Sequence, residues 1–123
     1  MQYRQIGTTN IRLSALGFGA MRLPEDEDEA VAVMRRAFDL GVNYLDTAHV
    51  YPNSESKCGK ALKGWRDRVY LSTKNPAHDK GLEGWWECLN TSLERLDTDY
   101  IDFYQAVHGL RWEQYGEFLL KRG

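Results

Sequence analysis

Four polar side chains with catalytic chemistry follow apolar stretches that are typical of β-strands: Asp46, Tyr51, Lys74 and His108. Each stands at the end of such a stretch or shortly after it, and parallel α/β proteins keep their catalytic groups at the carboxyl ends of strands. A buried lysine beside an aspartate and a tyrosine makes a phenol acidic enough to donate a proton near neutral pH. The joint pattern predicts one shared site.

Each of these residues also has a structural interpretation when it is taken alone. Asp46 could cap a turn, and Lys74 could be solvated at a strand end. Tyr51 could pack against the proline that follows it, and a lone His108 is more often structural than catalytic. Lys74 could also form a Schiff base with a carbonyl substrate, as in lysine-dependent aldolases. The neighbouring Asp46 and Tyr51 favour a charged lysine, which is a poor nucleophile.

The elements that must position these residues alternate between strand and helix. Apolar runs suited to strands cover 16–21, 42–46, 69–74 and 100–108. Apolar residues recur at helical spacing between the acidic run 25–29 and Gly41, from Ser54 to Gly64, over 82–96, and at Trp112, Tyr115 and Leu119. This alternation predicts parallel strand pairing with right-handed crossovers, so that all the strand ends point the same way.

Some local patterns carry more specific predictions. Residues 3–7 and 11–15 flank a polar turn and predict a hairpin that caps one end of a barrel, with Asn10 at a positive φ. Ser54 is expected to cap the second helix, whose inward residues include Ala61 and Leu62.

The segment 82–96 has the clearest amphipathic pattern in the sequence. Its apolar residues recur at intervals of three and four: Leu82, Trp85, Trp86, Leu89, Leu93 and Leu96. Both tryptophans are expected in the core rather than at a cofactor. Cys58 and Cys88 are expected to pack inside helices, because no CxxC pair or nearby histidine supports a disulfide or a metal site.

Length and charge exclude several classes of function. A chain of 123 residues with 42% hydrophobic content is long enough for one compact domain. Sixteen basic and eighteen acidic residues give a net charge of -2, without the basic stripe that a nucleic-acid partner requires. No apolar stretch approaches the roughly 18 residues of a membrane span, and the N-terminus lacks the apolar region of a signal peptide. We therefore expect no membrane partner and a cytoplasmic location.

A series of motifs in family order makes the chain similar to the N-terminal part of the aldo-keto reductases. The matching segments are Tyr3 to Gly7, Leu16 to Pro24, Leu45 to Ala48 with Tyr51, Ser54-Glu55, Ser72 to Lys74, and Ser92 to Leu96 through Asp99 to Asp102 and His108. The resemblance implies an α/β fold of the parallel (β/α) TIM-barrel type. A complete (β/α)8 barrel needs about 250 residues. Residues 1–123 are therefore expected to hold its N-terminal half, with about four strands and the hairpin as a cap.

The resemblance also implies the reduction of a small aldehyde or ketone with NADPH, without a metal. Tyr51 would protonate the carbonyl oxygen, and Lys74 would make the Tyr51 phenol more acidic. Asp46 would keep Lys74 charged, and His108 would orient the carbonyl group. Together these residues form the tetrad that the resemblance assigns to catalysis.

The cofactor prediction rests on fewer residues. Gly19, Ala20 and Met21 match the family segment near the nicotinamide ribose, which Asp46 also touches. In the family, later strands bind the rest of NADPH. Residues 21–24 and 107–110 are similar to a bacterial and archaeal branch that often carries a C-terminal iron-sulfur extension, for which this sequence holds no cysteines.

One alternative to an active enzyme follows from the same half-barrel. Four strands alone would expose two sheet edges and half of a barrel interior, which favours self-association. The chain could then be a non-catalytic interaction module, or a homodimer that pairs two half-barrels.

Overall fold

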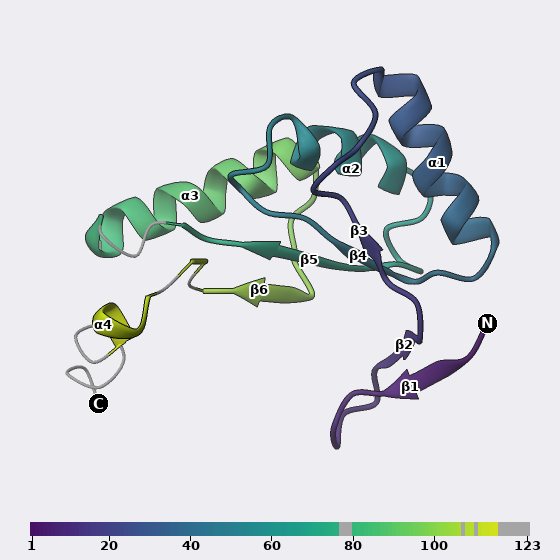
Figure 1. Cartoon of the computed structure of the whole chain (residues 1–123), viewed down its shortest axis with the longest axis horizontal. Helices are drawn as coiled ribbons and strands as arrows, with labels where there is room; N and C mark the ends of the chain where they lie inside the picture. Colours follow the sequence, from purple (N-terminus) through teal and green to yellow (C-terminus); the bar gives the residue numbers. More distant parts are fainter. Residues whose placement is uncertain (77–79, 107, 110, 116–123) are drawn as a thin grey trace.

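The chain folds into a small hairpin and a parallel sheet with helices (Figure 1). The computed structural model describes residues 1–76, 80–106, 108–109 and 111–115. The strands are β1 (Tyr3–Gln5), β2 (Arg12–Ser14), β3 (Phe18–Gly19), β4 (Tyr44–Asp46), β5 (Tyr70–Lys74) and β6 (Phe103–Gln105). The helices are α1 (Glu27–Asp39), α2 (Ser54–Leu62), α3 (Gly81–Leu96) and α4 (Trp112–Tyr115).

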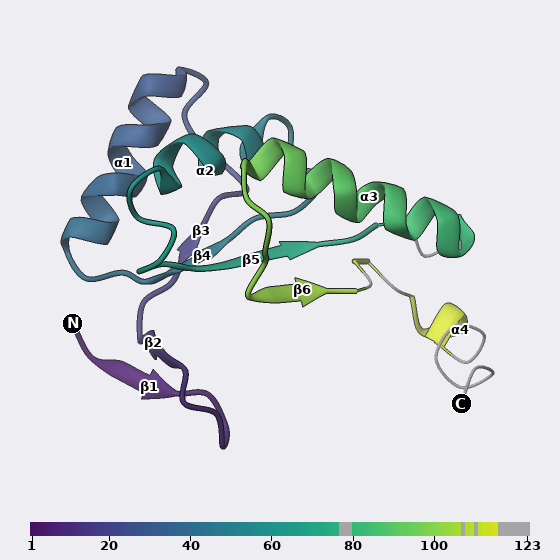
Figure 2. The same cartoon turned by 180° about the vertical axis from the view of Figure 1, so that it is seen from behind.

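The main sheet contains four parallel strands in the order β3-β4-β5-β6, as the alternation of patterns predicted. Figures 1 and 2 show α1, α2 and α3 together on one side of this sheet. Strand order follows chain order, so each helix connects neighbouring strands as in consecutive β/α units of a barrel. The predicted Leu119 of the last helical segment lies outside the described residues. Within the described part, no helix is both long enough and apolar enough to cross a membrane.

The core lies between the sheet and the helices. Its fully or almost fully buried members include Met34, Phe38, Leu45, Cys58, Ala61, Leu62, Leu71 and Leu96. Each large aliphatic or aromatic side chain buried here contributes about 1.5–3 kcal/mol from the loss of apolar surface to water. The predictions for Ala61 and Leu62, and for both cysteines as packing residues, are confirmed.

Helix α1 begins and ends where local chemistry predicts. The Asp26 side chain accepts a hydrogen bond from the Glu29 amide at 2.8 Å, which satisfies one free donor at the helix start. Acidic residues in the first turn favour the positive end of the helix dipole. Gly41 follows the helix at φ 95°, a conformation that glycine adopts without strain.

Helix α2 begins differently from the prediction. Ser54 is its first residue, and the cap position belongs to Asn53, which has a left-handed φ of 55°. The Ser54 hydroxyl donates to the Ala20 carbonyl oxygen at 2.6 Å and also lies 2.8 Å from the Thr47 hydroxyl. The capping prediction is wrong because this serine connects the helix to the loops after β3 and β4 instead.

Helix α3 buries a face that is shifted from the predicted one: Leu96 is buried as predicted, whereas Leu82 and Trp86 are exposed. Small residues dominate the buried stripe, which contains Gly84, Cys88, Ser92 and Leu96. Trp86 is 52% exposed and so lies outside the core, whereas Trp85 is partly buried. At its C-terminal end α3 packs closely on α2: a Cβ on Gly59 would lie 2.7 Å from the Leu96 carbonyl oxygen. A larger residue at position 59 does not fit at that separation.

The predicted hairpin is confirmed, with β1 antiparallel to β2. Its turn uses another residue for the positive φ: Gly7 has φ 52°, and Asn10 is not in that region. The Tyr3 hydroxyl donates to the Gly41 carbonyl oxygen at 2.9 Å, which fixes the hairpin beside the loop that leads into β4. The hairpin therefore lies at the amino end of the sheet, away from the candidate site.

A single guanidinium group fastens the amino ends of β5 and β6. Arg66 donates to the Asp102 carboxylate at 2.9 Å and to the Tyr100 carbonyl oxygen at 2.8 Å. The same Asp102 oxygen accepts a hydrogen bond from the Leu71 amide at 2.8 Å. We call this group the Arg66 clasp; it holds β6, which is shorter than the predicted strand 100–108, in register with β5.

Candidate active site

The first half of the site is a charge pair on adjacent strands. Asp46 ends β4 and is in register with Ser72 of β5, so Lys74, two residues further on, points to the same face. The Lys74 Nζ atom donates to Asp46 Oδ2 at 2.6 Å and to the Thr47 carbonyl oxygen at 2.7 Å. Lys74 is only 8% exposed, which excludes the interpretation of a solvated lysine.

Two further side chains surround the Asp46 carboxylate. The Ser72 hydroxyl donates to Asp46 Oδ1 at 2.8 Å, and the Gln105 amide nitrogen lies 3.5 Å from the same oxygen. Neither residue was predicted from the sequence to be part of the site. Side chains alternate between the two faces of a strand, so Ser72 and Lys74 lie on the same face of β5. The strand register places Gln105 beside Lys74 on that face. The alternation can be read from the sequence, whereas the register cannot.

Tyr51 lies in the loop 47–53, between β4 and α2. Its amide donates to the Ala48 carbonyl oxygen at 3.1 Å, and its own carbonyl accepts from the Ser54 amide at 3.2 Å, so the loop turns tightly on both sides of it. The Lys74 Nζ atom lies 5.1 Å from the centroid of the Tyr51 ring. The phenol is therefore next to a fixed positive charge.

His108 completes the cluster after β6. Its amide donates to the Asn75 carbonyl oxygen at 2.8 Å, which fastens it to the residue after β5. The rings of Tyr51 and His108 meet edge to face, with centroids 6.1 Å apart and planes at 89°. The structure thus brings all four predicted residues together at the carboxyl ends of the strands.

The segment predicted to meet a cofactor runs beside the Asp46 carboxylate. Gly19 is in register with Asp46, and the Ala20 amide donates to the Asp46 carbonyl oxygen at 2.8 Å. No atom lies within 4 Å of the place where a Cβ on Gly19 would stand, and Met21 is exposed. The Asp46 side chain remains 27% exposed, so its carboxylate is open to an external hydrogen-bond donor.

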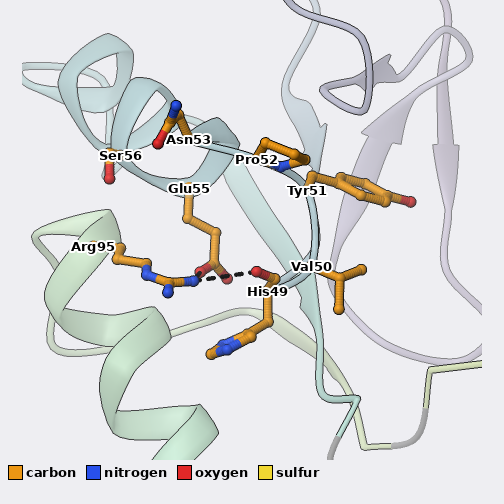
Figure 3. A pocket seen from close by; sticks show the side chains of 8 residues that line it. All are labelled: His49, Val50, Tyr51, Pro52, Asn53, Glu55, Ser56 and Arg95. Atoms are coloured by element: carbon orange, nitrogen blue, oxygen red, sulfur yellow. Dashed lines mark hydrogen bonds and ion pairs between the residues drawn. The ribbon is translucent and has the colours of Figure 1, made fainter.

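A small cavity adjoins the Tyr51 loop on its outer side (Figure 3). Its volume is about 260 Å³, and it is lined by His49, Val50, Tyr51, Pro52, Asn53, Glu55, Ser56 and Arg95. Glu55 is almost completely buried beneath it, and Arg95 reaches over from α3. No role for these two charged residues was predicted from the sequence.

Two other ionisable groups near the sheet hold their protons at neutral pH. Burial raises the pKa of the Cys58 thiol to about 12, and burial also raises the pKa of the Tyr104 phenol to about 12. Cys58 lies in the core behind β4, and Tyr104 packs edge to face on Trp85. Among the described residues, no group of three His, Cys, Asp or Glu side chains could hold a metal ion.

The chain is similar in sequence to known oxidoreductases. The sequence pattern described as Aldo/keto reductase family matches residues 15–111. The uncharacterized oxidoreductase YqkF of Bacillus subtilis (strain 168) is 38% identical over 121 residues, which are 89% of this chain and 39% of the relative. L-galactose dehydrogenase of Arabidopsis thaliana is 38% identical over 116 residues, covering 83% of this chain and 36% of the relative.

Solved structures similar to this chain are aldo-keto reductases as well. Aldo-keto reductase AKR11C1 from Bacillus halodurans, in its holo form, is 42% identical with a TM-score of 0.79, and the match covers 98% of this chain and 44% of that chain. Aldo/keto reductase from Klebsiella pneumoniae, in complex with NADP and acetate, is 34% identical with a TM-score of 0.70 and coverage of 76% and 35%. The chain thus spans about two fifths of the length of the relatives it matches. It belongs to the aldo/keto reductase family and folds as the N-terminal half of a (β/α)8 barrel, with a hairpin at its start.

Proposed function

We propose that this chain carries the proton-transfer half of an NADPH-dependent reductase that converts a small aldehyde or ketone to an alcohol. The observation that supports this function best is the buried Lys74 ammonium, paired with Asp46 at 2.6 Å and 5.1 Å from the Tyr51 ring. A desolvated positive charge stabilises the phenolate that forms when the phenol gives up its proton. Tyr51 is then the general acid.

Each of the other residues has a role that its contacts support. Asp46 pairs with the Lys74 ammonium, and the Asp46 carboxylate is itself held by the Ser72 hydroxyl. We assign His108, which lies edge to face with Tyr51, the role of orienting the carbonyl oxygen toward the phenol. These residues supply a proton and hold the substrate, and the nicotinamide supplies hydride when it is bound.

The cofactor assignment is supported by the segment at the end of β3, where Gly19 and Met21 are exposed and Ala20 is buried. Gly19, Ala20 and Met21 run beside Asp46, whose partly exposed carboxylate can accept hydrogen bonds from ribose hydroxyls. The Klebsiella pneumoniae relative, which was solved with NADP, favours the same nicotinamide cofactor for this chain. By resemblance, later strands of the barrel bind the rest of the cofactor.

The contacts of Lys74 disfavour the Schiff-base alternative. The ammonium donates to a carboxylate at 2.6 Å and to a backbone carbonyl oxygen at 2.7 Å, and both contacts stabilise the charged form. A charged amine has no free electron pair with which to attack a carbonyl carbon.

Cofactor binding and turnover test the proposal together. NADPH is titrated into the purified chain while its fluorescence is followed, and NADPH oxidation is then measured with a panel of small aldehydes. We expect saturable binding, and turnover that is lost in Tyr51→Phe. A folded sample with no response to millimolar NADPH would contradict the proposal for this chain.

A second candidate function is self-association without catalysis. It is favoured by the sheet face opposite the helices, where Tyr44, Tyr70 and Phe103 form a half-buried aromatic cluster with ring centroids 5.7–6.3 Å apart. Two copies could pair β3 of one with β6 of the other and close a homodimeric barrel. Mass measurement in solution separates the candidates: a stable dimer without a cofactor response supports this one, and a monomer with reductase activity removes it.

A further inference from the structure

A buried charge pair fastens the Tyr51 loop from its outer side. Glu55, in the first turn of α2, is 1% exposed, and its Oε1 accepts a hydrogen bond from the Thr73 hydroxyl at 2.7 Å. Its Oε2 is 3.3 Å from Arg95 Nη1. The same Nη1 atom donates to the His49 carbonyl oxygen at 3.1 Å. One nitrogen therefore joins α2, α3 and the loop.

His49 is held at three points. Its amide donates to the Lys74 carbonyl oxygen at 3.2 Å, its carbonyl accepts from Arg95, and its ring Nδ1 lies 3.3 Å from the Ser92 hydroxyl of α3. His49 precedes Tyr51 by two residues, so little chain remains between the fastened point and the phenol. Figure 3 shows Glu55 and Arg95 meeting on one side of the loop while the Tyr51 ring projects away from them.

The charge at Glu55 calls for a reason beyond packing. Burying a carboxylate is costly unless it is paired and hydrogen-bonded. A neutral amide of the same shape could accept the Thr73 hydrogen bond, so packing against β5 alone does not require the charge. The carboxylate adds a charge-assisted hydrogen bond to Arg95. This bond fixes the guanidinium group that donates to the His49 carbonyl oxygen.

We propose that Glu55 and Arg95 are positioning residues for the proton-transfer step. They hold the loop 47–53 against α3, so that the Tyr51 phenol stays beside Lys74 and His108. The catalytic consequence rests on the proposed function, whereas the restraint on the loop does not depend on it.

Amide hydrogen exchange on the whole chain tests the restraint directly. In Arg95→Met we expect the amides of His49 and Tyr51 to exchange at least about tenfold faster, since these hydrogen bonds break by local opening, while the β5 amides keep their rates. Arg36→Met, an exposed arginine of α1, is the matched control and should leave the loop unchanged. Arg95→Lys should restore part of the protection.

Glu55→Gln provides an independent variant if Arg95→Met does not fold. It keeps the side-chain shape and removes the charge, so we expect the same local increase in exchange. Unchanged loop amides in both variants would overturn the proposal. A uniform increase over the loop and β5 would overturn it as well, because the pair would then be a general stabiliser.

Turnover adds the catalytic readout. If the chain reduces an aldehyde with NADPH, Arg95→Met and Glu55→Gln should lower kcat by about ten- to a hundredfold with little change in KM, since the phenol is misplaced rather than removed. An unchanged kcat would refute the positioning role. A wild-type chain without turnover would contradict the proposed function, and the exchange rates would then decide the loop restraint by themselves.

Discussion

The two halves of the candidate site are held in different ways. Asp46 and Lys74 stand on adjacent strands, and their charged atoms meet at 2.6 Å. Tyr51 and His108 stand outside the strands and meet only ring to ring, with centroids 6.1 Å apart. The sheet register fixes the first pair, whereas backbone tethers from Asn75, Lys74 and α3 fix the second. The strand-held pair should therefore affect both stability and chemistry, and the loop-held pair chemistry alone.

The largest expected effect is on the loop-held half. Tyr51→Phe removes the proposed proton donor but keeps the ring that contacts His108, so we expect the reductase rate to fall by about 10²- to 10⁴-fold. The free energy of unfolding should change by no more than about 0.5 kcal/mol. Steady-state kinetics and urea unfolding measure the two quantities on the same sample. A large loss of stability would mean that the loop is not independent of the core.

The reactivity of Cys58 reports whether the loop 47–53 moves independently of the core. Cys58 lies in α2, which directly follows this loop. With its pKa raised from 9.0 to about 12, the folded thiol is deprotonated roughly a thousandfold less at pH 8 than an unfolded one. In a Cys88→Ala background, we expect alkylation by iodoacetamide to be slower than in urea by at least about that factor, because the folded thiol is also completely buried. Mass spectrometry follows the reaction.

The same pKa shift has a consequence for stability. The folded state binds the thiol proton more tightly than the unfolded state, so the free energy of unfolding should fall as the pH rises from about 9 toward 12. Cys58→Ala should flatten this part of the profile. Rapid alkylation of the folded chain at pH 8 would show instead that α2 opens together with the loop.

A substitution in the strand-held pair should lower the free energy of unfolding, which Tyr51→Phe should leave almost unchanged. Asp46→Asn leaves the buried Lys74 ammonium without its carboxylate, and we expect the free energy of unfolding to fall by about 2–3 kcal/mol. Reductase activity should fall as well. Urea unfolding checks the first effect, with Tyr51→Phe as the matched comparison. Equal stabilities of the two variants would abolish the distinction between the halves.

The last variant tests the packing of α2 against α3, the helices that lie behind both halves of the site. Gly59→Ala places a Cβ 2.7 Å from the Leu96 carbonyl oxygen, so α2 and α3 must separate slightly, at a cost of about 1–3 kcal/mol. Thermal unfolding measures this cost. Asn90→Ala, on the exposed face of α3, serves as the control and should be close to neutral. A stabilised Gly59→Ala would mean that the helices are not in close backbone contact.

Local patterns predicted the strands and the four polar residues because both are encoded over short stretches. The apolar run that forms β5 ends at Lys74, and the run that forms β4 ends at Asp46, as the sequence analysis expected. Parallel pairing then brings these ends together without further information. The end of α1 at Gly41 was predictable for the same reason, since the required left-handed φ is a property of one residue.

The errors arose where distant segments determine the outcome. Ser54 bonds to Ala20, 34 residues away, and so does not cap its own helix. The close approach of Gly59 in α2 to the Leu96 carbonyl oxygen in α3 is likewise not visible in the periodicity of 82–96. Glu55 and Arg95 are 40 residues apart, and their pairing depends on the packing of α2 against α3. Such contacts become visible only when the register of helices on the sheet is known.

The Arg66 clasp lies at the end of the strands opposite to the four polar groups. Arg66 holds Asp102 at 2.9 Å and the Tyr100 carbonyl at 2.8 Å, before β6 begins. Loops at the end with the four polar groups can therefore be exchanged while the other end keeps β5 and β6 aligned. This arrangement separates changes in the loops from the maintenance of the sheet, and it marks the region around Arg66 as one to leave unchanged when the loops are redesigned.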